Sequence, residues 1–150
     1  MTETNPVSDR ELKAHSCLES VDKLPADPEM SSFKRRARLQ QALWRESKGF
    51  EIGTQPMRPK VGLSTRPLGS RISLSYARES NANFLNEKVL KAVRYRIEHP
   101  EPHQMIDQDR LFSDLLSSMP MCFNLFGSYH GDLNAADHAV HSWWPDVPGK

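Results

Sequence analysis

Apolar residues recur at helical spacing in four stretches of the chain, and polar or proline-containing segments separate them. The first stretch predicts a helix over residues 28–48, because proline suits its first position and Gly49 is typical of the residue after a last turn. Asp27 is the expected N-cap. One stripe of this helix is expected to pack against the rest of the chain, and it carries Phe33, Ala37 and Trp44.

Three further helices are predicted in the second half of the chain. They span residues 86–99, 107–127 and 134–144, and Pro120 is expected to kink or restart the middle one. The residues expected to cap them are Asn86, Asp107 and Asn134.

The remaining segments show little helical periodicity. Residues 1–26 lack a sustained apolar period and are predicted to be a mobile N-terminal arm or a weak helix. Residues 49–83 are basic and rich in proline and glycine, and the alternation of Ile72, Leu74 and Tyr76 with polar residues predicts one short strand. The predicted fold class is mainly α, with four to five helices, a long Pro/Gly-rich basic loop and one short strand. Residues 27–150 are expected to form a single helical region.

Composition limits the class of protein. With 150 residues, of which 37% are hydrophobic, the chain has room for one domain with a modest core. Two cysteines do not make a disulfide framework, the N-terminus has no apolar signal-peptide core, and no apolar stretch in the chain is long enough to span a membrane. We therefore expect a cytoplasmic protein that does not bind a membrane.

The net charge of +1 conceals a positive middle and negative ends. Residues 31–78 carry eleven basic and two acidic residues, a net charge of +9, whereas residues 1–30 and 101–150 carry −4 and −5. Such a segment can bind a polyanion, or it can pair with the acidic ends of the same chain. The side chains predicted to follow a nucleic-acid backbone are Lys34, Arg35, Arg38 and Arg45 on the first helix and Arg58, Lys60, Arg66 and Arg71 in the loop.

Residues with catalytic or metal-binding chemistry do not form a complete motif. The triplet ESK (residues 46–48), with Asp27 upstream, has the acid-x-Lys order of restriction-type nucleases. It is predicted at the end of a helix, however, where residues i and i+2 point in different directions. His138 and His141 lie one helical turn apart, but neither cysteine has a CxxC partner to complete a zinc site. The sequence therefore offers no catalytic residue and no metal or cofactor site.

Residues 117–127, SSMPMCFNLFG, are the longest nearly unbroken apolar stretch in the chain. We expect this stretch to be buried, with Cys122 acting as a small hydrophobic residue. Asn124 is expected to be buried with it as a hydrogen-bonded amide.

These residues give the chain a resemblance to a known family. From about residue 31 to residue 144 it resembles the N-terminal region of a bacterial PD-(D/E)XK nuclease-like, restriction-endonuclease-like domain family. The likeness is carried by RRARLQ (35–40) leading to WRE (44–46), RPLGSR (66–71), NFL (83–85), HPEPH (99–103), ID (106–107), RL (110–111) and SSMPMCFNLFG (117–127).

In that family the metal-binding aspartate and the acid-x-Lys triplet lie on strands that follow this region. The resemblance therefore implies the N-terminal part of an α/β restriction-endonuclease-like fold, with the catalytic strands beyond Lys150 and Mg²⁺ as the cofactor of a full-length member. No catalytic residue of the family falls on a position of this chain. We accordingly expect a truncated or separately encoded portion that is not catalytic alone.

Two functions are compatible with these features. The first is the DNA-binding and scaffold portion of a nuclease-like protein, with DNA bound by the basic residues 31–78. The second is a protein–protein interaction module or a degenerate, non-enzymatic remnant. In the second case Met119–Phe126 would dock onto a partner protein, or onto a nuclease core that this chain lacks.

Overall fold

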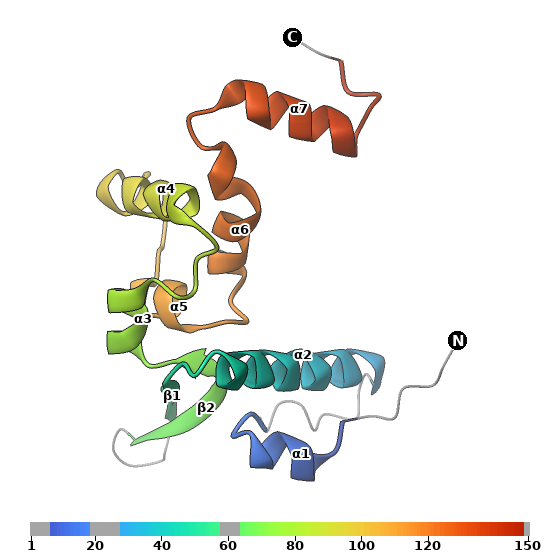
Figure 1. Ribbon diagram of the computed structural model, residues 1–150, viewed down its shortest axis with the longest axis vertical. Helices are drawn as coiled ribbons and strands as arrows, with labels where there is room; N and C mark the ends of the chain where they lie inside the picture. The colour runs from blue at the N-terminus through green and yellow to red at the C-terminus, as the bar shows by residue number, and fades with distance from the viewer. Residues whose placement is uncertain (1–6, 19–27, 58–63, 149–150) are drawn as a thin grey trace. The chain divides into compact units, whose positions relative to one another are not determined.

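The computed structural model describes residues 7–18, 28–57 and 64–148, and this part of the chain is mainly helical with one two-stranded sheet (Figure 1). The predicted mainly α fold class is therefore confirmed. The chain divides into two compact units. Unit 1 consists of Met1–Asn83 and Gln108–Ser117, and unit 2 consists of Phe84–Asp107 and Ser118–Lys150.

Unit 1 is built on a long helix and a β-hairpin. Its elements are α1 (Asp9–Ala14), α2 (Pro28–Ser47), β1 (Ile52–Met57), β2 (Ser64–Ile72), α3 (Leu74–Ser80) and α5 (Gln108–Ser113). As predicted, α2 ends just before Gly49, whose φ of 67° is a backbone conformation that glycine adopts without strain. Asp27, the expected N-cap of α2, lies outside the described residues.

The N-terminal segment, expected to be a mobile arm or a weak helix, contains the short helix α1. Its start is a capping box: the Glu11 N–H donates to the Ser8 hydroxyl at 3.2 Å, and the Ser8 hydroxyl and N–H donate to the Glu11 carboxylate at 2.7 and 2.8 Å. The hydrogen bonds from Ser8 hold the pKa of the Glu11 carboxyl below its usual range. Leu12 and Cys17 are fully buried with Ala42 of α2, so this segment forms part of the core of unit 1.

The hairpin of unit 1 is antiparallel, with Thr54 opposite Pro67 and Gln55 opposite Arg66. The register shifts between Ile52 and the next residue, which marks a bulge at the start of β1. Prolines fit these strands because each strand of a two-stranded sheet has an open edge, where no ladder hydrogen bond is lost.

The strand predicted from Ile72, Leu74 and Tyr76 is wrong in its extent. β2 ends at Ile72, and Leu74 is already the first residue of α3. The Ala77 N–H donates to the Ser73 carbonyl at 2.8 Å, which closes the first helical turn. Five alternating residues are too few to separate the period of a strand from the first turn of a helix.

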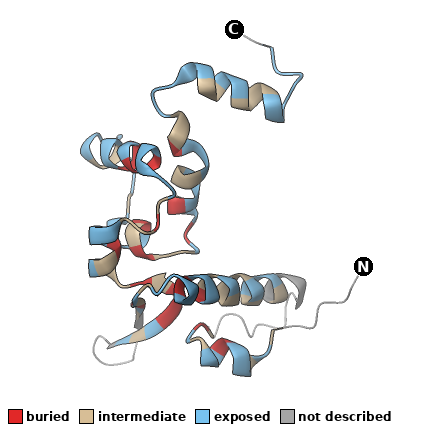
Figure 2. Cartoon of the chain, viewed as in Figure 1, coloured by how far each residue is buried: buried red, intermediate tan, exposed pale blue. Residues whose placement is uncertain are grey.

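α2 packs with a different side from the predicted one, and Figure 2 shows the buried positions along it. Phe33 and Trp44, expected to pack, are 61% and 37% exposed. Ala42 and Arg45 are buried instead, and the Arg35 side chain is only 13% exposed. Arginine can occupy the packed side because its apolar stem contacts neighbouring residues while carbonyl oxygens accept the hydrogen bonds of its guanidinium group.

Unit 2 is helical. Its elements are α4 (Glu87–Glu98), α6 (Ser118–Phe126), the short 3-10 helix η2 (Gly127–Tyr129) and α7 (Leu133–Trp143). Asn86 caps α4 as predicted, since its side-chain oxygen accepts a hydrogen bond from the Val89 N–H at 3.0 Å. Val89 and Ala92 are buried against Gly127, where an added Cβ would lie 3.3 Å from the Val89 Cα. The absence of a side chain at this glycine lets η2 approach α4 closely.

The single helix predicted over residues 107–127 is two helices, α5 and α6. The chain leaves the helical path after α5 because the Leu115 N–H donates to the Ser70 carbonyl of β2 at 3.1 Å. Pro120 lies in the first turn of α6, where its nitrogen needs no helical hydrogen bond. The expected restart of the helix near this proline therefore occurs, but two residues earlier.

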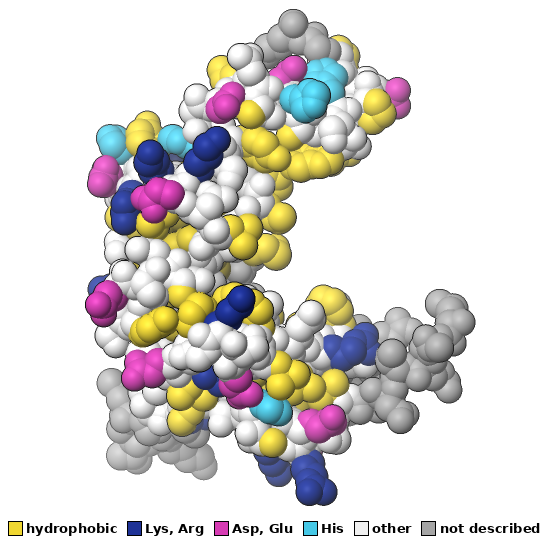
Figure 3. Space-filling model, viewed as in Figure 1, with side chains coloured by type: hydrophobic (Ala, Val, Ile, Leu, Met, Phe, Trp, Pro, Cys, Tyr) yellow, Lys and Arg dark blue, Asp and Glu magenta, His cyan; other side chains and the backbone are white. Residues whose placement is uncertain are grey.

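The apolar run of α6 is largely exposed, which differs from the expectation of burial within the chain and agrees with the alternative of a docking surface. More than half of the surface is exposed at Met121, Leu125 and Phe126. Cys122 is also exposed. Hydrophobic side chains gather over α6 and along α7 (Figure 3). Asn124 is half-buried, and its Oδ1 accepts a hydrogen bond from the Leu85 N–H at 2.9 Å, so the amide is hydrogen-bonded as expected.

The last helix, α7, begins at a different cap from the predicted one. Asp132 caps it instead of Asn134, and its Oδ1 accepts a hydrogen bond from the Ala135 N–H at 3.0 Å. Among the described helices, none combines the length and the apolar character needed to cross a membrane.

Candidate nucleic-acid interface

The eight basic residues predicted to contact nucleic acid occupy different environments. Two of them, Arg58 and Lys60, lie outside the described residues. Lys34 is exposed on α2. The other five are partly or wholly covered by unit 1: Arg35, Arg38, Arg45, Arg66 and Arg71.

Two of the covered arginines hold the N-terminal segment. The Arg35 Nε and Nη2 donate to the Val7 carbonyl at 2.9 and 2.7 Å, and Nη2 lies 2.7 Å from the Asp9 carboxylate. The Arg66 Nη1 donates to the Leu18 carbonyl at 3.0 Å. These contacts hold residues 7–18 against α2 and β2, so both arginines have a structural role that the charge pattern did not predict.

Arg45 connects three parts of unit 1. It is 7% exposed, and its Nε donates to the Gly69 carbonyl of β2 at 2.9 Å. Its Nη1 donates to the Phe50 carbonyl at 2.9 Å, and its Nη2 lies 3.0 Å from the Glu46 carboxylate. All three nitrogens of the guanidinium group therefore bind within the protein, which makes Arg45 a support of the fold rather than a surface contact.

The acid-x-Lys triplet of residues 46–48 lies at the end of α2, as predicted. The Glu46 carboxylate is bound on both oxygens, by Arg45 at 3.0 Å and by the His15 ring at 2.8 Å. A nuclease carboxylate must instead face a metal ion together with other oxygen ligands. Both oxygens of the Glu46 carboxylate are held by side chains of unit 1 in this structure.

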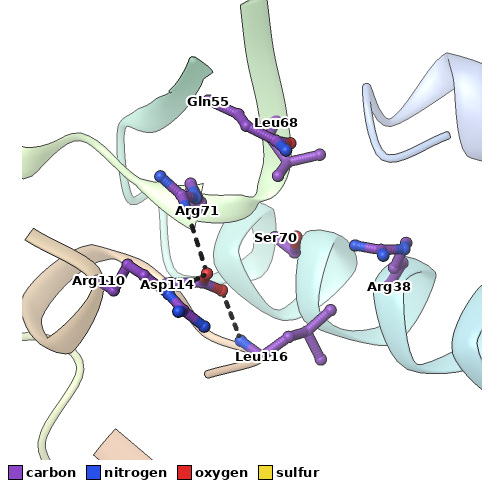
Figure 4. Close-up of a pocket in the computed structure, with 8 residues that line it drawn as sticks. All are labelled: Arg38, Gln55, Leu68, Ser70, Arg71, Arg110, Asp114 and Leu116. Carbon is purple, nitrogen blue, oxygen red and sulfur yellow. Dashed lines mark hydrogen bonds and ion pairs between the residues drawn. The ribbon is translucent and has the colours of Figure 1, made fainter. Parts of the chain in front are cut away.

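Arginines from different elements converge on a hollow of about 330 Å³ in unit 1 (Figure 4). We call it the arginine hollow. It is lined by Arg38 of α2, Gln55 of β1, Leu68, Ser70 and Arg71 of β2, Arg110 of α5, and Asp114 and Leu116 from the segment after α5. Two of its three arginines, Arg38 and Arg71, belong to the predicted nucleic-acid-binding set.

Arg71 is fixed in the wall of the hollow. Its Nη2 lies 3.2 Å from Asp114 Oδ2, with both side chains 15% exposed, and its Nη1 donates to the Thr54 carbonyl at 3.3 Å. The second oxygen of the same carboxylate accepts a hydrogen bond from the Leu116 N–H at 3.1 Å. The guanidinium group is thereby held in one orientation at the surface of the hollow.

Sequence reasoning missed Arg110, the third arginine of the hollow. It lies in the acidic C-terminal part of the sequence, so its position in the charge pattern does not connect it to the basic middle. The fold brings it there because the segment after α5 is held against β2, where the Leu115 N–H donates to the Ser70 carbonyl at 3.1 Å and Arg71 pairs with Asp114. The order of charges along the chain does not predict a contact between these distant segments.

Metal-binding side chains do not assemble within the described part of the chain. No group of three or more His, Cys, Asp or Glu side chains there is placed to hold a metal ion. His141, one of the two histidines singled out on the last helix, lies 3.5 Å from the Asp137 carboxylate.

A second hollow, of about 370 Å³, lies in unit 2 and is mainly apolar in its lining. Its lining includes Phe123, Phe126, Tyr129 and the exposed cysteine Cys122. His130, also on its wall, packs against the ring of Tyr95 at a centroid distance of 4.7 Å. This lining is typical of a surface that contacts apolar groups, and it differs in kind from the arginine hollow.

Comparison with known protein families identifies a match. The family model described as PD-(D/E)XK nuclease superfamily matches residues 25–148, a range that runs from just before α2 to beyond α7. No curated protein and no solved structure matches the chain.

Proposed function

We propose that this chain, which belongs to the PD-(D/E)XK nuclease superfamily, binds DNA through unit 1 and serves as the DNA-binding and scaffold portion of a nuclease-like protein. The observation that carries the proposal is the convergence of three arginines on one hollow. Arginine binds phosphate oxygens with paired, charge-assisted hydrogen bonds, and contacts of this kind position DNA-binding proteins on the duplex.

The residues assigned to DNA differ in part from the predicted set. Lys34 is exposed one helical turn before Arg38, so α2 presents two cations on the same side near the hollow. Together with Arg71 and Arg110 these side chains give four positive charges in one region of unit 1. Arg45 is excluded from this surface because its three nitrogens already bind within the fold.

Mg²⁺ is the metal that the superfamily resemblance implies. Both oxygens of Glu46 are in contact with Arg45 and His15, so this carboxylate does not face an ion in this structure. No group of three or more His, Cys, Asp or Glu side chains among the described residues is placed to hold a metal ion. We accordingly assign these residues the binding and support of DNA rather than the cleavage of its backbone.

Binding to duplex DNA is expected to weaken steeply with salt. Four phosphate contacts correspond to a slope of about −3.6 in a plot of log affinity against log salt, so affinity should fall roughly 150-fold between about 50 and about 200 mM salt. The measurement is fluorescence anisotropy of a labelled duplex titrated with the full chain at several salt concentrations. Absence of binding at every salt concentration, or binding that does not change with salt, would contradict the proposal.

A pair of matched variants locates the surface. Lys34→Gln with Arg38→Gln should reduce the magnitude of the salt slope by about 1.8, because each phosphate contact contributes about 0.9. The control is Lys88→Gln with Lys91→Gln, which removes the same charge from exposed positions on α4 of unit 2. The control should leave the slope unchanged.

A second function, a protein–protein interaction module, is favoured by the exposed apolar side chains of unit 2. We define the α6–α7 surface by Met121, Leu125, Phe126, Trp143 and Trp144, which are between 47% and 59% exposed. Large exposed aromatic and aliphatic side chains on neighbouring elements are typical of surfaces that dock a protein. The proposed occupant is a partner protein with a complementary apolar face.

This alternative predicts that the isolated chain associates with itself, because its apolar surface lacks its partner. Sedimentation velocity should then show species larger than a monomer, and Leu125→Asp should return the chain to a monomer without loss of helical circular dichroism. Leu85→Asp, at a residue that is 74% exposed outside α6 and α7, is the control and should not change association. A folded wild-type chain that sediments only as a monomer would contradict the alternative.

A further inference from the structure

Three buried side-chain atoms of the described residues have no hydrogen-bond partner, and all three belong to residues of the arginine hollow. They are Gln55 Oε1, Ser70 Oγ and Arg71 Nε. Ser70, which is only 1% exposed, is one of the residues that line the hollow. Native proteins contain few buried polar atoms without partners, because each costs free energy. Their gathering at one hollow makes it a candidate site for a polar ligand that supplies the missing partners.

The unpartnered donors are held in place before a ligand binds. Arg71 already uses Nη1 and Nη2 in its contacts with Thr54 and Asp114, and this leaves Nε as a donor fixed in direction. Ser70 follows the glycine that packs β2 against α2, and its own carbonyl is fixed by the Leu115 N–H at 3.1 Å. A ligand that accepts hydrogen bonds here therefore loses little affinity to the ordering of side chains.

The charges of the lining residues indicate an anion. Arg38, Arg71 and Arg110 contribute three positive charges, and Asp114 contributes one negative charge. A phosphomonoester carries a charge of about −1.5 to −2 near neutral pH and three strong acceptor oxygens, whereas each backbone phosphate carries a single negative charge. The charge of the hollow therefore matches a phosphomonoester more closely than a phosphate within a strand.

We propose that the arginine hollow binds a phosphomonoester, the group carried by a free nucleotide and by the phosphorylated end of a nucleic-acid strand. The volume of about 330 Å³ is at the small end of ligand cavities, which suits one phosphate with part of its sugar. Arg71 Nε and the Ser70 hydroxyl donate to the phosphate oxygens, and the Gln55 amide accepts from a hydroxyl of the ligand. This proposal rests on the proposed function, because nucleic acid is taken as the source of the phosphate.

The test compares two short single-stranded oligodeoxynucleotides of the same sequence, one with a 5′-phosphate and one with a 5′-hydroxyl. Fluorescence anisotropy with the full chain should show binding at least about tenfold tighter for the phosphorylated strand, as expected for new charge-assisted hydrogen bonds. Competition with dAMP separates the two sources of the group. If dAMP displaces the phosphorylated strand, the hollow also binds free nucleotides. If the chain prefers the phosphorylated strand but dAMP does not displace it, the hollow binds strand ends.

Variants connect the preference to the hollow. Ser70→Ala should lower the preference for the 5′-phosphate about fivefold or more while leaving the denaturation midpoint unchanged or higher, because the hydroxyl it removes has no partner in the fold. A purely structural role for the hydroxyl would lower the midpoint instead. Arg110→Gln should also reduce the preference, and Arg78→Gln is the control, since Arg78 is an exposed arginine of unit 1 that pairs with Asp109 outside the hollow.

The outcomes separate this inference from DNA binding itself. Equal binding of both oligonucleotides, with no binding of dAMP, overturns the phosphomonoester site and leaves salt-dependent DNA binding intact. Binding of dAMP without binding of duplex DNA supports the site and contradicts the proposed function. Wild-type preference in both Ser70→Ala and Arg110→Gln would place any phosphate site elsewhere and overturn the assignment to this hollow.

Discussion

Replacing Arg45 with alanine is expected to lower the free energy of unfolding by about 3–5 kcal/mol. The substitution removes the hydrogen bonds to the Gly69 and Phe50 carbonyls, both at 2.9 Å, and leaves these oxygens without their partner. It also removes the apolar stem of a side chain that is 7% exposed. Folded domains are stable by only about 5–15 kcal/mol, so the variant should lose a large part of its stability.

Urea denaturation followed by circular dichroism measures this effect. The matched control is Arg36→Ala on the same helix, where the arginine is exposed and its Nη1 donates to the Ser32 hydroxyl at 2.8 Å. The control should change stability by no more than about 0.5 kcal/mol. If Arg45→Ala instead keeps full stability and only weakens DNA binding, Arg45 is a surface contact, as the sequence pattern predicted, and its structural assignment is wrong.

The second large effect is expected at Gly69, where alanine should cost about 3 kcal/mol. A Cβ at this position would overlap the His15 carbonyl oxygen and would lie 2.9 Å from the Ala42 Cβ. Neither group is the end of a flexible side chain, so β2 must move away from α2 and from the segment after α1. The Gly69 N–H bond to the Ser16 carbonyl, at 2.9 Å, would be stretched by the same movement.

Gly49→Ala is the control for this substitution. Gly49 has a φ of 67° and open space around its Cα, so alanine there meets only the cost of a left-handed backbone, about 1 kcal/mol. Equilibrium denaturation of both variants should therefore give the larger loss at Gly69. An equal or smaller loss at Gly69 would show that β2 is not held as closely against α2 as its backbone indicates.

The Gly69 variant also bears on function, because the residues on either side of this glycine, Leu68 and Ser70, line the arginine hollow. A shift of β2 should therefore weaken phosphate binding together with stability. Ser70→Ala is expected to weaken binding alone. The comparison of the two variants separates damage to the support of the hollow from loss of a group that contacts its ligand.

Several features followed from the sequence because they depend on residues close together in the chain. The end of α2 at Gly49 and the cap of α4 at Asn86 are set by local backbone geometry and by side-chain hydrogen bonds over three residues. The N-cap of α7 was predicted two residues too late, because Asp132 and Asn134 are both good N-cap residues and local reasoning does not choose between them. The family was also recognisable, and its match over residues 25–148 includes the segments that carried the resemblance.

The side on which α2 packs could not be predicted, because a helical wheel places arginine outside by default. Arg45 is inside because the Gly69 and Phe50 carbonyls, which come from other segments, accept its hydrogen bonds. For Leu125 and Phe126 the sequence left two alternatives open, burial within the chain or exposure as a docking surface, and the structure has them exposed. An apolar run shows that burial would be favourable, but the pattern does not say whether another element of the chain covers it.

The sequence by itself determined the mainly helical class, the ends of the best-capped helices, the concentration of positive charge in the middle of the chain and the membership in the nuclease superfamily. Only the tertiary structure decided which basic residues support the fold and which line the arginine hollow. Arg45 was taken into the core, and Arg110 was brought from an acidic segment to join Arg38 and Arg71. The physical reason is that a guanidinium group binds whichever oxygens it meets, and the fold determines whether those belong to the protein or to a ligand.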